Sequence, residues 1–126
     1  MPQLHWALVC RKMEINAETN NPTLHEIYDS VSAPSYPVKH SPMKLICKWE
    51  GEHGDEFKQT VQTVHADSGG LWHESDVVHV RISKRFNITT LDYDGFIVPK
   101  AGDYIFHIMA DGLSIHSITM HFVLDQ

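Results

Sequence analysis

Histidine has the clearest chemical potential of any residue type in this sequence, because it occupies ten of the 126 positions. Imidazole is a common ligand of divalent metal ions and titrates close to neutral pH. Two dipeptides, His25-Glu26 and His73-Glu74, begin like the zinc-protease motif His-Glu-x-x-His. Neither is followed by the second histidine at the required position, so neither predicts a protease site.

His107 and His116 are the histidine pair with a geometric argument for a metal site. A two-residue turn at Asp111-Gly112 would place them directly opposite each other on adjacent strands, with Cβ atoms about 5 Å apart. Two facing imidazoles can share a divalent ion, although a site usually takes a third or fourth ligand, and none is visible nearby. The alternative is a polar cross-strand pair on a solvated face. We therefore keep His107 and His116 as candidate metal ligands and expect no cofactor.

Other reactive residue types lack the arrangement that catalysis needs. Cys10 and Cys47 lie among apolar neighbours, which raise the pKa of a thiol, so buried free thiols are favoured over a disulfide. The segment 92–95, Asp-Tyr-Asp-Gly, departs from calcium-loop spacing and is typical of a turn. Ser68 lies outside the Gly-x-Ser-x-Gly frame of a nucleophile elbow. An enzyme is therefore the less favoured class of protein.

Aromatic residues outside the alternating strand pattern are candidates for a partner-binding patch, because exposed rings are enriched at interfaces. The alternative interpretation is that these rings cap the open ends of a sheet sandwich, since single apolar side chains are common on ordinary surfaces. The candidates are Trp72, Tyr36, Tyr93 and Phe96.

The elements that would position these side chains are clearest near the C-terminal end. Asp111-Gly112 lies between alternating apolar runs and predicts a tight hairpin turn, because both residues tolerate positive φ. The register that follows pairs Ala110 with Leu113, Ile108 with Ile115 and Phe106 with Ser117.

In that register the last strand changes the face of its apolar residues midway along its length. A shift of one residue moves a strand's apolar set from one face of a sheet to the other. We therefore predict a β-bulge near His116–Ser117. The bulge would return the second apolar set to the core, namely Ile118, Met120, Phe122 and Leu124.

The rest of the chain has short alternating segments separated by turn-forming residues, as in sheets with one solvated face. Residues 77–86 form one such predicted strand, with Val78, Val80, Ile82 and Phe86 facing the core. Segment 23–33 is ambiguous, since Leu24, Ile27, Tyr28 and Val31 follow helical spacing but also suit a strand. The pattern predicts one all-β domain over residues 1–126, an antiparallel β-sandwich of about seven to eight strands with little or no helix. Its topology would be immunoglobulin-like or jelly-roll-like.

Composition and charge exclude several classes of partner. The formal net charge of −6 opposes binding to phosphate backbones, so we expect no nucleic acid. The basic pairs Arg11-Lys12 and Lys84-Arg85 are isolated and are interpreted as solvated strand faces or ends. No run approaches the roughly 20 apolar residues of a membrane-spanning helix, and no signal peptide is apparent. We expect no membrane association and a cytoplasmic location.

Two stretches resemble a family of small bacterial proteins of unknown function. They are residues 27–37, which contain Ile-Tyr-Asp-Ser-Val and Ala-Pro-Ser-Tyr-Pro, and residues 96–108, with Asp111-Gly112 beyond. Gly51-Glu52 and the turn at 67–69 accompany them. The resemblance spans Trp6 to Val123 and implies a compact antiparallel β-sandwich with residues 27–31 in a strand. It implies no catalytic residue and no ligand.

Two hypotheses of function follow. The first is a non-catalytic binding or protein-interaction module with a protein partner, or a homodimer that pairs through exposed sheet edges or an apolar face. Apolar residues on both faces of the first and last strands favour it, because such strands need cover on both sides. These residues include Ala7, Val9, Leu113 and Ile115. The second hypothesis is a metal-binding protein or metal-dependent enzyme that uses clustered histidines.

Overall fold

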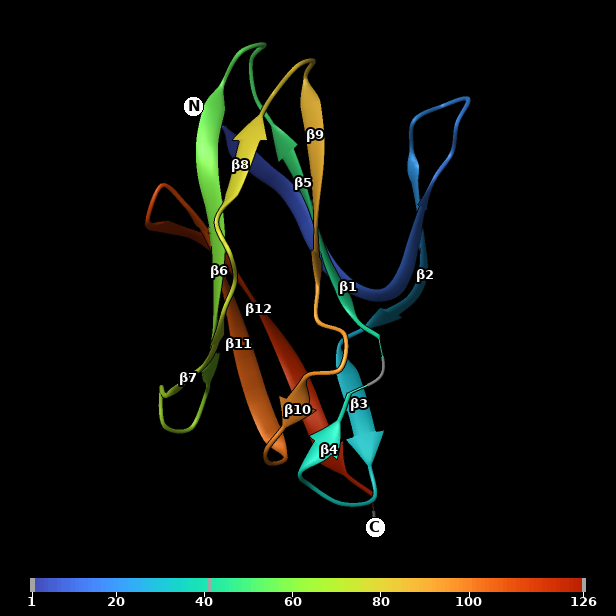
Figure 1. Ribbon diagram of the computed structural model, residues 1–126, viewed down its shortest axis with the longest axis vertical. Coiled ribbons are helices and arrows are strands. Elements are labelled where there is room, and N and C mark those ends of the chain that lie inside the picture. The colour runs from blue at the N-terminus through green and yellow to red at the C-terminus, as the bar shows by residue number, and fades with distance from the viewer. Residues whose placement is uncertain (1, 41, 126) are drawn as a thin grey trace.

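The computed structural model describes residues 2–40 and 42–125, and within them every regular element is a β-strand (Figure 1). The predicted all-β sandwich is confirmed: two sheets pack face to face around an apolar interior. The twelve strands of the described residues outnumber the predicted seven to eight, because several are only two to four residues long. No helix in this part of the chain is long and apolar enough to cross a membrane.

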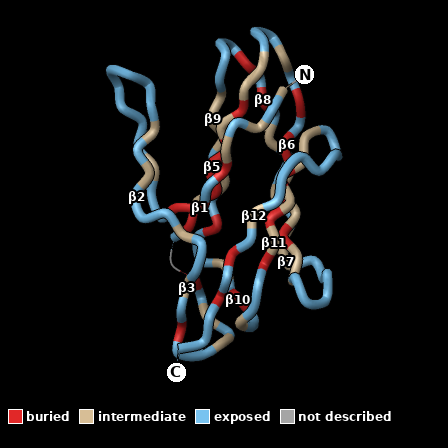
Figure 2. Tube along the Cα trace, turned by 180° about the vertical axis from the view of Figure 1, so that it is seen from behind, coloured by how far each residue is buried: buried red, intermediate tan, exposed pale blue. Residues whose placement is uncertain are grey.

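The first sheet has four antiparallel strands in the order β2-β1-β5-β9. Strand β1 is long enough to pair with β5 through its first half and with β2 through its second half, so the β1–β2 hairpin projects beyond the sheet. The tip of that hairpin is exposed (Figure 2). The bounds of the strands are β1 (Gln3–Ile15), β2 (Pro22–Tyr28), β5 (Lys44–Glu50) and β9 (Phe86–Asp92).

The second sheet follows the order β3-β12-β11-β6-β7, and β8 pairs with another part of β6. Strand β3 runs parallel to β12, so the prediction of a purely antiparallel sandwich is wrong at this one pair. A two-stranded ribbon of β4 (Val38–Lys39) and β10 (Ile97–Val98) lies apart from both sheets. The bounds of the second sheet are β3 (Ser30–Ala33), β6 (Glu56–His65), β7 (Leu71–Glu74), β8 (Val78–Arg81), β11 (Gly102–Ala110) and β12 (Leu113–Leu124).

The ambiguous segment 23–33 is extended and supplies two strands, β2 and β3, which belong to different sheets. Only Asp29 separates them, and Glu26, within β2, has a positive φ of 57°. A residue in that left-handed conformation bends an extended chain. The chain therefore passes from the first sheet to the second within this segment, and the helical spacing of its apolar residues does not correspond to a helix.

The core lies between the sheets and is built from alternate residues of the central strands. In β11 the inward residues Tyr104, Phe106 and Ile108 are all buried, as the alternation predicts. The largest fully buried side chain is Trp49 of β5, whose ring packs against Phe57 with a centroid distance of 4.5 Å. Cys10 and Cys47 are buried free thiols, as expected.

The predicted strand over residues 77–86 is two strands. The chain leaves the second sheet after Arg81 and enters the first sheet at Phe86, so β8 and β9 belong to opposite layers. Ile82 remains fully buried in the crossing, whereas Phe86 is 37% exposed. The expectation that Phe86 points into the core together with Val80 and Ile82 is therefore wrong.

The closing hairpin has the predicted two-residue turn. Asp111 and Gly112 have φ values of 49° and 82°, and Ala110 pairs with Leu113. The Asp111 carboxylate also accepts a hydrogen bond from the backbone N–H of Lys58 at 2.9 Å, which ties the turn to the start of β6.

The predicted bulge is present, but it lies nearer the turn than His116–Ser117. Ile115 is the extra residue, because Met109 faces Ser114 and Ile108 faces His116. Beyond it Phe106 faces Ile118, so the expected Phe106–Ser117 and Ile108–Ile115 pairs are wrong. Met120 and Phe122 are returned to the core, whereas Leu124 is exposed near the end of the strand.

Candidate functional site

The bulge separates the two histidines that the unbulged register would bring face to face. His107 lies opposite Ser117, and its Nδ1 is 2.7 Å from the Ser117 hydroxyl, while His116 lies opposite Ile108. The geometry that motivated a shared metal ion is therefore absent. Over residues 2–40 and 42–125 no three His, Cys, Asp or Glu side chains are placed to hold a metal ion together.

The aromatic residues proposed as a partner-binding patch pack mainly inward. Tyr93 is 1% exposed, with its ring 5.4 Å from that of Phe106, so it belongs to the core and cannot contribute to a surface patch. Trp72 and Phe96 are partly buried against each other at 5.8 Å. They close one end of the sandwich, which matches the alternative interpretation of these rings.

The polar atoms of these end-capping rings satisfy backbone groups. The Trp72 indole N–H donates to the carbonyl of Ile97 at 3.1 Å, which ties β7 to β10. The Tyr36 hydroxyl donates to the carbonyl of Val123 at 2.9 Å, which ties the loop before β4 to β12. Both contacts hold the fold together, and each uses the polar atom of its ring.

His73 lies inside this aromatic cluster. Its ring centroid is 4.5 Å from that of Phe96 and 5.5 Å from that of Tyr93. Burial among these rings lowers the pKa of His73 below the ordinary value, because the imidazolium form would lose its hydration. Asp76 opposes this shift. The surroundings thus favour a neutral structural histidine.

A polar group crosses the centre of the sandwich. The Trp49 indole N–H donates to Oε1 of the fully buried Gln59 at 2.7 Å, and the Thr89 hydroxyl donates to the same oxygen at 2.6 Å. Burial raises the pKa of the nearby Cys47 thiol to about 12, which keeps it protonated and unreactive. Trp49, Gln59 and Cys47 are fully buried and Thr89 is partly buried, and we assign this cluster to stability.

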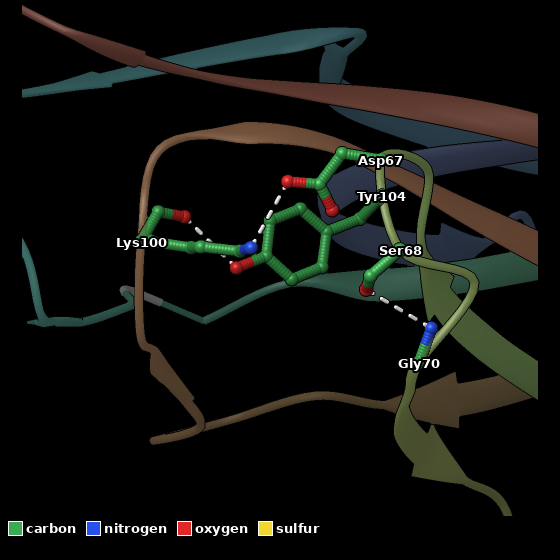
Figure 3. Close-up of polar contacts among 5 residues, drawn as sticks. All are labelled: Asp67, Ser68, Gly70, Lys100 and Tyr104. Atoms are coloured by element: carbon green, nitrogen blue, oxygen red, sulfur yellow. Dashed lines mark hydrogen bonds and ion pairs between the residues drawn. The ribbon is translucent and has the colours of Figure 1, made fainter.

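A surface cleft of about 420 Å³ lies between the turn after β6 and the start of β11. Its charged groups already neutralise each other, since the Lys100 ammonium is 3.0 Å from the Asp67 carboxylate (Figure 3). The Tyr104 hydroxyl donates to the Lys100 carbonyl at 2.8 Å, and Gly70 N–H donates to the Ser68 hydroxyl at 3.1 Å. These bonds brace two turns, and the remaining carboxylate of the lining, Asp103, lies 2.7 Å from His121 Nδ1.

A second cleft, of about 520 Å³, lies between the tip of the β1–β2 hairpin and the start of β9. We call it the basic cleft. Its charged lining is Lys48, Lys84 and Arg85, and no Asp or Glu lines it, although the chain has 16 acidic and 10 basic residues. The remaining lining is uncharged, with apolar, hydroxyl or amide side chains: Ile15, Thr19, Asn20, Asn21, Pro22, Ser83, Phe86, Asn87 and Ile88.

The three cations of the basic cleft differ in their partners. The Lys48 ammonium lies 4.4 Å from the centroid of the Phe86 ring, and the Arg85 guanidinium lies 5.2 Å from it. Arg85 also forms an ion pair with Glu50 at 3.3 Å. Lys84 makes no ion pair within the described part of the chain. The cleft therefore offers uncompensated positive charge beside an exposed aromatic ring.

Sequence reasoning missed this site, because it interpreted Lys84-Arg85 as an isolated, solvated pair and placed Phe86 in the core. Lys48 comes from another strand, and the opposite wall comes from the β1–β2 turn. The one signal in the sequence was the basic pair itself, directly before the aromatic residue. Only the crossing of the chain between sheets brings these groups to the surface together.

The two face-to-face sheets and the closed core define this molecule as a β-sandwich domain. The chain belongs to a family of unknown function (DUF6941), whose profile matches residues 5–123. This confirms the resemblance seen in the sequence. No curated protein matches the chain.

Solved structures with little sequence similarity share the fold. The alkylpurine DNA glycosylase AlkC of Pseudomonas fluorescens, bound to DNA with an abasic site analogue, matches at a TM-score of 0.57 and 8% identity, over 97% of this chain and 30% of that one. A β-glucosidase from Listeria innocua gives 0.54 and 5%, over 75% and 15%. The C-terminal domain of Wzt gives 0.54 and 12%, over 99% and 75%. The chain spans a minor part of both enzymes, and these likenesses show the fold alone.

Proposed function

We propose that this domain is a non-catalytic binding module whose basic cleft holds an acidic segment of a protein partner. The observation that carries the proposal is the charge of the cleft: three cations and no carboxylate line it in a chain with a net charge of −6. Opposite charge at such a surface attracts and orients a partner.

The chemistry of the lining specifies the partner further. Ile15, Phe86 and Ile88 offer apolar surface beside the ammonium groups. A segment with alternating carboxylate and apolar side chains would place its charges on Lys48 and Lys84 and its apolar groups against these three residues. Charge-assisted hydrogen bonds and buried apolar area then contribute together.

The lining also supports binding rather than catalysis. It contains no histidine or carboxylate that could act as a general base toward Ser83 or Thr19. We place this binding in the cytoplasm, where free buried thiols such as Cys10 and Cys47 persist in reduced form.

The test is an amide-resolved NMR titration with the acetylated, amidated tetrapeptide Glu-Leu-Glu-Phe. We expect saturable shifts at Asn87, Ile88 and the β1–β2 turn, and none with Lys-Leu-Lys-Phe. Lys84→Gln and Lys48→Gln should each weaken binding several-fold. The matched control is Lys58→Gln, because Lys58 is an exposed lysine of β6 outside the cleft. Equal binding by all three variants, or shifts confined to other surfaces, would overturn the proposal.

A further inference from the structure

Three buried polar atoms at the aromatic end of the sandwich have no hydrogen-bond partner among the described residues. They are the hydroxyl of Thr63 in β6, Nδ1 of His73 in β7, and the hydroxyl of Tyr93, which directly follows β9. Nearly all buried polar groups of folded proteins are hydrogen-bonded, either to protein or to an ordered water molecule. The three atoms therefore indicate that something other than these side chains bonds to them.

The three residues are mutual neighbours. Thr63 and His73 lie directly opposite each other in the antiparallel pair of β6 and β7, where facing Cβ atoms are about 5 Å apart. The His73 and Tyr93 rings are in contact, with a centroid distance of 5.5 Å. The Thr63 hydroxyl lies near the Tyr93 phenol, since it opposes the rise in the pKa of Tyr93 that burial causes. Each polar atom thus belongs to a neighbour of the other two residues.

Other polar atoms at this end of the sandwich do find partners in the protein. The Tyr104 hydroxyl donates to the Lys100 carbonyl at 2.8 Å, and the Trp72 indole N–H donates to the Ile97 carbonyl at 3.1 Å. The Trp72 and Tyr104 rings are themselves in contact at 5.3 Å. Packing of the aromatic rings therefore does not prevent direct hydrogen bonds here, and the three unpartnered atoms are a separate feature.

The chemistry of the three atoms specifies a small neutral ligand that both accepts and donates hydrogen bonds. Both hydroxyls can donate, whereas Nδ1 of a neutral imidazole accepts when Nε2 carries the proton. Burial raises the pKa of Tyr93 and lowers that of His73, so the phenol and the imidazole are both neutral near pH 7. The three groups carry no charge, which opposes a bound ion.

We propose that one internal water molecule binds between Thr63, His73 and Tyr93. The Tyr93 and Thr63 hydroxyls donate to the water oxygen, and the water donates one O–H to Nδ1 of His73. Each of the three atoms then has a partner, and the water makes three hydrogen bonds, as is typical of buried water in proteins. The water links the second sheet to the segment that leaves the first. The site is independent of the basic cleft, whose lining includes none of these residues.

A high-resolution crystal structure of the full chain tests the site directly. We expect an ordered water oxygen within hydrogen-bonding distance of all three atoms. A direct hydrogen bond between the Thr63 and Tyr93 hydroxyls, with no water between the three residues, would overturn the proposal. This test needs no substitution, so it does not depend on whether a variant folds.

Magnetic relaxation dispersion of the water oxygen counts long-lived internal waters in solution. Tyr93→Phe and Thr63→Val each remove one hydroxyl and keep the ring or the branched shape, and each should remove one long-lived water. The matched control is Tyr104→Phe, which removes a hydroxyl bonded to the Lys100 carbonyl and should leave the count unchanged. Thermal unfolding confirms that the variants are folded. An unchanged count in both site variants, or the same loss in the control, contradicts the proposal.

The protonation of His73 gives a readout that packing alone would not determine. Long-range nitrogen–proton NMR correlations should place the proton of neutral His73 on Nε2, with Nδ1 as a hydrogen-bond acceptor. In Tyr93→Phe the signal of Nδ1 should shift toward that of an acceptor without a hydrogen bond. If Nδ1 carries the proton in the wild type, the water cannot donate to it and the proposed arrangement is wrong.

Discussion

Trp49 of the first sheet donates its indole N–H to Gln59 of the second, and this hydrogen bond links the two layers through the middle of the core. The same amide oxygen accepts the Thr89 hydroxyl. One buried acceptor thus satisfies two donors, of which Trp49 is fully buried and Thr89 partly buried. Buried donors that lose their acceptor each cost about 1–3 kcal/mol.

Replacement of this acceptor should destabilise the domain strongly. In Gln59→Met the side-chain volume is nearly kept, but both donors lose their partner, so we expect the free energy of unfolding to fall by about 2–4 kcal/mol. Thr89→Val removes only one donor and should cost about 1 kcal/mol. Urea denaturation followed by tryptophan fluorescence measures both. Equal losses in the two variants would contradict the shared-acceptor account.

Thiol accessibility should report the burial of the two cysteines. Burial raises the pKa of Cys10, and raises that of Cys47 to about 12, so neither presents a thiolate at neutral pH. Native protein should not react with a disulfide reagent such as DTNB within minutes at pH 7.5. Unfolding in guanidinium should expose both thiols at once. Fast reaction of either thiol in the native state would show that its strand opens locally.

His73 should make stability depend on pH in the acidic range. Its pKa is lowered in the folded state, so the unfolded chain takes up a proton first as the pH falls. The stability that neutral His73 contributes is complete above the pKa of His73 in the unfolded chain, near 6.5. It is lost as the pH falls through the lower pKa of His73 in the folded state. His73→Phe keeps an aromatic ring and removes the titration. The difference in unfolding free energy between the two proteins should therefore change below pH 6.5, and a constant difference would contradict this account.

The hairpin turn should tolerate only residues that accept positive φ and supply a side-chain acceptor. Asp111→Asn keeps both properties, and the expected change is below about 0.5 kcal/mol. Asp111→Val loses the bond to the Lys58 N–H and places a β-branched residue at a φ of 49°, so a loss of about 2–3 kcal/mol is expected. Thermal unfolding compares the two. Similar midpoints would mean that the turn relaxes without cost.

Sequence reasoning predicted those parts of the fold that depend on neighbouring residues. Asp111-Gly112 fixes a turn because its two residues alone determine the backbone conformation. The mismatch of apolar faces in the last strand required a bulge. The exact position of the bulge at Ile115 did not follow from the sequence, because an extra residue just before or just after Ile115 would also return Ile118 to the core. Packing against β11 decides between these positions.

The candidate sites were less predictable, because they depend on contacts distant in sequence. Nothing near Phe86 indicates that the chain changes sheets between Arg81 and Phe86, and a continuous alternating pattern concealed the crossing. The prediction that His107 pairs with His116 was wrong for a related reason: the one extra residue in β12 shifts the pairing partner of every residue after it. The basic cleft joins Lys48 with Lys84 and with the β1–β2 turn, and no spacing rule connects these positions.

The parallel pairing of β3 with β12 has a consequence for how the protein is made. Ser30–Ala33 finds its neighbouring strand only in Leu113–Leu124, at the opposite end of the chain. While the polypeptide is being synthesised, the early strand must wait unpaired until the last one has left the ribosome. Contacts of such large sequence separation slow folding, because the intervening chain must be ordered first. Completion of the second sheet therefore follows the synthesis of β12, and a chain truncated before β12 leaves β3 without its neighbour.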